Sequence, residues 1–151
     1  MSICDIFVAV AYGPACVENS RYRRALEMFL KAASENGISV YIAPANECWG
    51  TSRPPRRAAI AADHEALRRA SCFVYFTGGF DSDGALVELG MALGWKKRII
   101  VVRWDSNDFS SHVKGLIDIE AAAEYVLPAE PTADELWPRL LLKYLITPRK
   151  P

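Results

Sequence analysis

Residues 72–94 read CFVYFTGGFDSDGALVELGMALG, and this stretch is the one that most clearly indicates the class of fold. Cys72 to Thr77 is a short apolar run bounded by glycine, which is typical of a strand buried on both faces. Gly78 to Gly84 is rich in turn-forming residues. Ala85 to Leu93 has the pattern of a helix, and Gly94 ends it. The stretch therefore predicts a strand, a tight turn and a helix in direct succession.

The same alternation continues toward both ends of the chain. Four further strands are predicted at 3–11, 39–43, 98–103 and 124–127, and further helices at 20–35, 54–70 and 132–145. Thr132 is the predicted N-cap of the last helix, with Asp134 and Glu135 in its first turn. Alternating strands and helices indicate a parallel sheet covered on both faces. We therefore expect an α/β protein, a three-layer Rossmann-like (flavodoxin-like) sandwich with a five-stranded, mainly parallel sheet. One domain would span residues 1–146, followed by a flexible tail at 147–151.

The composition argues against several classes of binding partner. Eighteen Lys and Arg residues balance 18 Asp and Glu residues, so no charge surplus points to a nucleic acid or an anionic membrane. No apolar stretch approaches the roughly 20 residues that a membrane helix needs, and the N-terminus does not resemble a signal peptide. The four cysteines are widely spaced, which favours free thiols in a reducing cytoplasm over zinc or disulfides. We expect a cytoplasmic protein without a metal or cofactor.

In such a sheet, ligands bind beyond the carboxyl ends of the strands. The loop before the helix at 85–93 has the most informative pattern. Its glycines allow close approach to a ligand, and the helix N-terminus near Gly84 could hold an anion together with the Ser82 hydroxyl. Glu88 lies one turn into that helix and could face the same crevice. The alternative is that Glu88 only complements the helix dipole and that Ser82 is an ordinary N-cap.

A second carboxylate, Asp63, lies on the preceding helix near its apolar face. A carboxylate there is costly unless it is paired or used. It could instead be solvated and pair with Arg56, Arg57 or Arg68 of its own helix. Two carboxylates in one crevice would allow one to attack a sugar and the other to orient its hydroxyls.

Further candidate ligand contacts come from other loops. Tyr12, Trp49 and Phe80 could stack on a flat base, although packing in the core or at its rim is the alternative for each. Ser111 could reach a ligand in a neighbouring subunit, although the serines at 110 and 111 could equally begin a helix.

These residues together resemble a known family. Asp63 to Ala70, a strand, and then SDGALVELGMA at 82–92 resemble the nucleoside 2-deoxyribosyltransferase-like family. Within that family, Glu47-Cys48-Trp49-Gly50 followed by Asp63-His64 is most similar to the nucleotide N-glycosidases, including the cytidylate and hydroxymethylcytidylate hydrolases of nucleoside-antibiotic pathways. Gly94-Trp95-Lys96-Lys97 lacks the proline that the family usually has before its fourth strand.

The resemblance implies a role for each matching residue. Glu88 would be the nucleophile, Asp63 would contact the substrate and position that nucleophile, and Ser82 would bind the 5′-phosphate. Ser111 would come from the partner subunit of a homodimer or higher homo-oligomer with shared active sites. The first loop departs from the family pattern, so Tyr12 and Gly13 are only candidates for contact with the base.

The implied reaction is hydrolysis of the N-glycosidic bond of a nucleoside 5′-monophosphate, of pyrimidine and cytidine type, through a covalent glycosyl-glutamate. Three alternatives remain open at this point. A nucleoside acceptor could replace water and give base exchange, the fold could cleave a nicotinamide dinucleotide, or the chain could bind a nucleotide without reaction.

Overall fold

The computed structural model describes residues 5–77, 82–104 and 109–148. Its strands form one five-stranded sheet in the order β2-β1-β3-β4-β5, and every neighbouring pair is parallel. The strands are β1 (Ile6–Ala9), β2 (Val40–Tyr41), β3 (Cys72–Phe76), β4 (Arg98–Trp104) and β5 (Ala123–Leu127). The predicted α/β fold is therefore confirmed, and the described sheet is parallel throughout.

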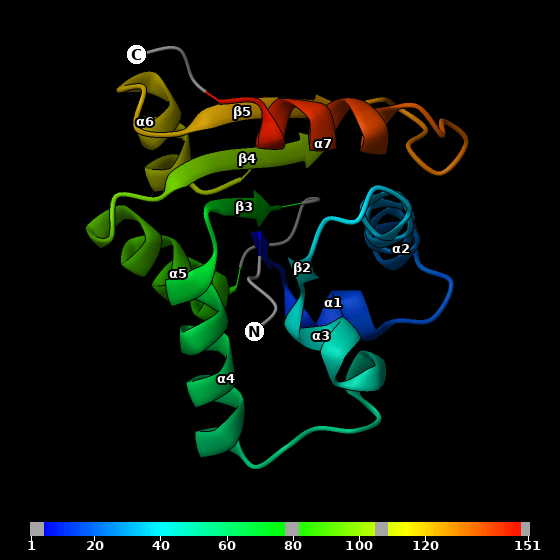
Figure 1. The fold of residues 1–151 in the computed structure, drawn as a ribbon, viewed down its shortest axis with the longest axis vertical. Helices are drawn as coiled ribbons and strands as arrows, with labels where there is room; N and C mark the ends of the chain where they lie inside the picture. The colour runs from blue at the N-terminus through cyan, green and yellow to red at the C-terminus, as the bar shows by residue number, and fades with distance from the viewer. Residues whose placement is uncertain (1–4, 78–81, 105–108, 149–151) are drawn as a thin grey trace.

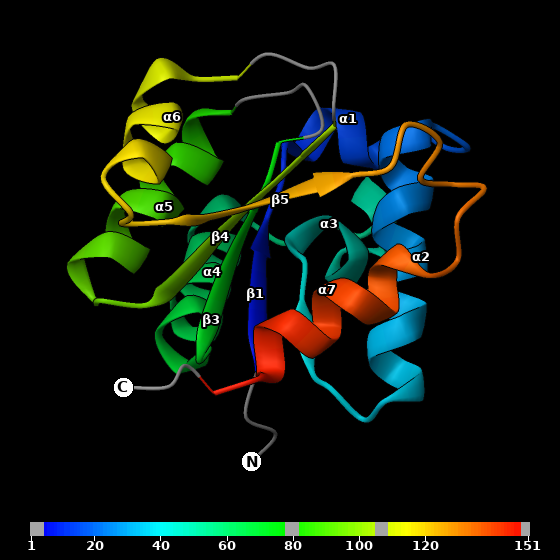
Figure 2. The same ribbon diagram turned by 90° about the horizontal axis from the view of Figure 1, so that it is seen from above.

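Helices cover both faces of this sheet, as Figures 1 and 2 show. The helical segments are α1 (Tyr12–Cys16), α2 (Arg21–Glu35), α3 (Ala43–Asn46), the 3-10 turn η1 (Cys48–Gly50), α4 (Arg56–Arg69), α5 (Asp83–Gly94), α6 (Ser111–Asp118) and α7 (Trp137–Ile146). Helices α4, α5 and α6 pack on one face, whereas α2 and α7 pack on the other. This arrangement gives the three predicted layers.

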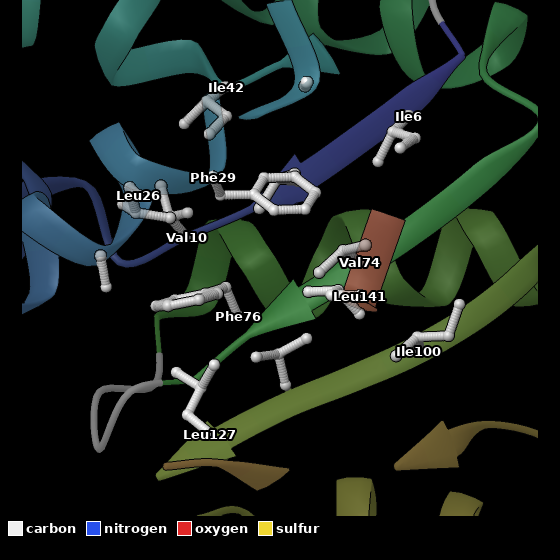
Figure 3. Packing of buried hydrophobic residues seen from close by; sticks show 14 of the residues in the cluster. Ile6, Val10, Leu26, Phe29, Ile42, Val74, Phe76, Ile100, Leu127 and Leu141 are labelled. Atoms are coloured by element: carbon white, nitrogen blue, oxygen red, sulfur yellow. The ribbon is translucent and has the colours of Figure 1, made fainter. Parts of the chain in front are cut away.

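Period-2 alternation along the strands divides the core into two halves. Val74 and Phe76 of β3 point toward α2 and α7, while Phe73 and Tyr75 point toward α4 and α5. Figure 3 shows the first half, where Phe29 of α2 lies over the strands. Because both faces are buried, β1 and β3 are apolar at every position, which made them recognisable in the sequence.

The segment after β1 differs from the prediction. The strand ends at Ala9, and residues 12–16 form the short helix α1 where a loop was expected. The Ala11 amide donates to the Tyr22 hydroxyl at 3.0 Å rather than to a neighbouring strand, so the ladder stops there. Residues 43–46 also form a short helix in place of a loop, with Pro44 in its first turn and buried.

The predicted start of the last helix is wrong. Thr132 does not cap it, because α7 begins five residues later, at Trp137. The buried Trp137 indole donates to the Pro131 carbonyl at 2.8 Å and stacks on Phe29, with ring centres 6.4 Å apart. These contacts hold residues 131–136 in turns and bends before the helix, so tertiary packing overrides the capping pattern.

Candidate active site

The strand order reverses between β1 and β3, which makes the carboxyl ends of these strands the expected binding crevice. After β1 the chain passes to α1 and α2 on one face. After β3 it passes to α5 on the other face. The two connections diverge, and folds of this topology commonly bind ligands between the residues that begin such connections.

Glu88 lies on α5, at the edge of the helix face that packs against the sheet. Its neighbours Ala85, Leu89 and Ala92 pack into the core, and Glu88 itself is half-buried at the border of that face. Burial and, to a smaller extent, the negative charge of Asp63 together raise the pKa of the Glu88 carboxyl to about 8. Glu88 and Asp63 therefore lie near enough to interact electrostatically.

Asp63 lies on α4 and points toward the sheet. Its Oδ1 accepts a hydrogen bond from the Tyr41 hydroxyl at 2.8 Å, and Tyr41 is held by stacking on Phe7 at 5.4 Å. The neighbouring Arg68 pairs instead with Glu65, on the outer side of the helix. Burial raises the pKa of Asp63, while the hydrogen bond from Tyr41 opposes that shift. Among the described residues, Asp63 therefore forms no ion pair with an arginine of its own helix, and its contact with a substrate stays a prediction.

Next to Asp63 is a cavity of about 340 Å³ between the loop after β2 and the start of α4. Its wall includes Tyr12, Glu47, Arg53, Arg56, Ile60 and Asp63. The Tyr12 hydroxyl donates to Glu47 Oε2, and the Arg53 guanidinium lies 4.4 Å from the centre of the Tyr12 ring. Burial and the bond to Glu47 raise the pKa of Tyr12, so its hydroxyl remains a neutral donor.

Two residues of this site were missed in the sequence. Glu47 was quoted only as part of a motif, and Tyr41 only as part of a strand. Glu47 lies in a polar loop, where an acidic residue is ordinary, so little in the sequence pointed to it. Tyr41 likewise had no signal, because an aromatic residue at the end of a strand is ordinary.

Ser82 and Gly84 begin α5. The Ser82 hydroxyl caps the helix by accepting from the Ala85 amide at 3.2 Å, as in the ordinary alternative. Gly84 is exposed in the first turn, and open space surrounds the position that a side chain would occupy. Both residues leave room for an anion, and their contact with phosphate stays a prediction.

The remaining predicted contacts are scattered. Gly13 is exposed on α1, and Ser111 is exposed at the first residue of α6. Trp49 is half-buried against the core, with the Arg23 guanidinium 4.7 Å from its ring centre. Phe80 lies outside the described residues. The structure thus brings Tyr12 and Asp63 to one cavity, while the base-stacking role of Trp49 stays a prediction.

Within residues 5–77, 82–104 and 109–148, no group of three or more His, Cys, Asp or Glu side chains is placed to hold a metal ion. In the same ranges, no helix has the length and apolar character needed to cross a membrane.

The chain is thus an α/β protein of flavodoxin-like topology in which the carboxyl groups of Glu88 and Asp63 interact electrostatically. Neither a protein-family model nor a curated protein matches the chain. Among solved structures, the chain resembles the CMP N-glycosidase BcmB of Clostridium botulinum, with a TM-score of 0.66 and 18% identity, over 93% of this chain and 98% of that one. It also resembles BlsM, with a TM-score of 0.67 and 19% identity, over 99% and 98%. At these identities, the likeness establishes the shared fold.

Proposed function

We propose that the chain is a nucleotide N-glycosidase that hydrolyses a pyrimidine nucleoside 5′-monophosphate of cytidine type. The observation that carries this proposal is the half-buried Glu88 carboxyl on α5, the helix that follows β3, where it interacts electrostatically with Asp63 of α4. A carboxylate in that position can both attack a sugar carbon and stabilise the positive charge that develops on it. The similar fold of a protein described as a CMP N-glycosidase supports the choice of substrate.

The proposed reaction is a double displacement. Glu88, once ionised, attacks C1′ as the bond from C1′ to the base nitrogen breaks, and the bonding electrons leave with the base, which takes up a proton. Water then attacks C1′ of the glycosyl ester, loses a proton, and releases the sugar 5-phosphate and free Glu88. Asp63 orients the sugar hydroxyls, while Ser82 and the first turn of α5 hold the phosphate.

Loss of the nucleophile is the direct test. Glu88→Ala should lower release of free base from CMP by at least about a thousandfold, because the proposed glycosyl ester forms on the Glu88 carboxylate. Chromatography of the free base measures the rate, and circular dichroism checks that the variant is folded. Turnover close to wild type in a folded variant would refute the assignment.

The same assay separates the alternatives. Addition of a second free base would yield a new nucleoside if the chain catalysed base exchange. Incubation with a nicotinamide dinucleotide would release nicotinamide if that were the substrate. Thermal stabilisation by CMP without any product would identify a binding protein.

A further inference from the structure

Glu47 is a buried acid for which the proposed mechanism has no use. Its side chain is 9% exposed, and it lines the cavity next to Asp63. Burial of a carboxylate is costly unless its oxygens find donors. The Tyr12 hydroxyl donates to Oε2, and among the described residues no other side chain donates to this carboxylate. Glu47 Oε1 is therefore available to a donor that enters the cavity.

The backbone after Glu47 is held in an unusual conformation. Cys48, Trp49 and Gly50 have φ angles of 50°, 56° and 93°, and the first two are residues that rarely adopt positive φ. Such conformations are energetically unfavourable and persist where surrounding contacts impose them. Here the stacking of Arg23 on Trp49 is one of those contacts. The turn ends α3 and keeps Glu47 at the cavity wall.

Arg53 supplies the opposite chemistry on the same wall. Its guanidinium stacks on the ring of Tyr12, whose hydroxyl binds Glu47, so Tyr12 bridges the carboxylate and the guanidinium. A carboxylate only accepts hydrogen bonds, and a guanidinium only donates them. The wall therefore matches a flat ring that carries an amino group and a carbonyl oxygen.

We propose that Glu47 is a specificity-determining residue that selects pyrimidines with an exocyclic amino group, with Arg53 binding the ring carbonyl. The amino group donates to Glu47, as cytosine N4 does to carboxylates elsewhere. A pyrimidine with a carbonyl oxygen at that position would set two acceptors against each other and be rejected. This inference rests on the proposed function, because it takes the cavity to be the base subsite of that reaction.

The test compares kcat/KM for CMP and UMP in the full-length wild type, Glu47→Gln and Glu47→Asp. Glutamine preserves the shape and still accepts from Tyr12, but it offers a donor to the base. Glu47→Gln should lower kcat/KM for CMP by roughly 10- to 100-fold and change that for UMP less than about threefold. Glu47→Asp, which withdraws the carboxylate, should fall between wild type and Glu47→Gln. Glu65→Gln is the matched control on the outer side of α4, and it should keep the wild-type ratio.

Equal losses for CMP and UMP in both folded Glu47 variants would overturn the proposal and assign Glu47 a structural role. A binding measurement separates this inference from the proposed function. Calorimetry on the Glu88→Ala variant should show tighter binding of CMP than of UMP. In the double variant that also carries Glu47→Gln, CMP and UMP should bind equally. If the wild type releases no base but shows this preference, the glycosidase assignment fails and the inference stands. Equal affinities of the Glu88→Ala variant for CMP and UMP would contradict the inference.

Discussion

Among single residues, the interaction between Glu88 and Asp63 affects the protonation state of Glu88. Burial and the Asp63 charge raise the pKa of Glu88 to about 8, so the acid is largely protonated at neutral pH. A nucleophilic carboxylate must be ionised. Occupation of the site by a developing cation would favour the ionised form, which links the pKa to the proposed reaction.

The dependence of rate on pH should follow this ionisation. We expect kcat/KM for CMP to rise about tenfold per pH unit below 8 and to level off above it, because kcat/KM reports groups of the free enzyme. Asp63→Asn removes the repelling charge and should move the midpoint to lower pH, even though it reduces the rate. Initial rates measured from pH 5 to 10 check both. A midpoint unchanged by Asp63→Asn would contradict the electrostatic coupling.

The same pKa has a consequence for stability. When pH rises above the ordinary pKa of 4.5, the unfolded chain loses the Glu88 proton while the folded chain keeps it until about pH 8. The free energy of unfolding therefore falls with pH across this window and is constant above it. Glu88→Gln lacks this ionisation. Above pH 8 the free energy of unfolding of Glu88→Gln should therefore exceed that of wild type by about a few kcal/mol, as the size of the pKa shift implies. Urea unfolding at pH 4.5 and pH 8.5 measures the difference, which should nearly vanish at the lower pH.

At the scale of elements, α5 depends on the cap that Ser82 provides. Ser20 caps α2 in the same way, by accepting from the Arg23 amide at 3.1 Å. The two serines therefore separate the structural effect of a cap from any effect on ligand binding.

Ser82→Ala and Ser20→Ala should each cost about 1 kcal/mol of stability. If Ser82 also binds phosphate, only Ser82→Ala should raise KM for CMP, and it should leave KM for the nucleoside cytidine nearly unchanged. Steady-state kinetics on both substrates provide the comparison. Equal KM effects of the two variants would reduce Ser82 to a helix cap.

For the whole molecule, stability depends on how α7 joins the sheet to α2. Trp137 is 1% exposed, stacks on Phe29 of α2 and donates to Pro131. The segment after β5 therefore packs against α2, which ends far earlier in the sequence, at Glu35.

Trp137→Ala should reduce the free energy of unfolding by about 3–5 kcal/mol, because it leaves a cavity and an unpaired carbonyl. Trp95→Ala is the control: that side chain is 43% exposed, and its loss should cost within about 0.5 kcal/mol. Chemical denaturation followed by circular dichroism measures both. Similar midpoints for the two variants would show that α7 contributes little to the core.

The sequence alone indicated the three layers, because apolar runs such as 72–76 alternate with helical patterns, as in a parallel sheet covered on both faces. The pattern also made Glu88 and Asp63 candidates, although an ordinary role was open for each, and their catalytic roles came from the family resemblance. Only the tertiary structure decided that Tyr41 bonds Asp63, that Glu47 bonds Tyr12, and that α7 starts at Trp137. These features depend on contacts between residues far apart in the chain, and local pattern does not record which distant side chain will supply a hydrogen bond.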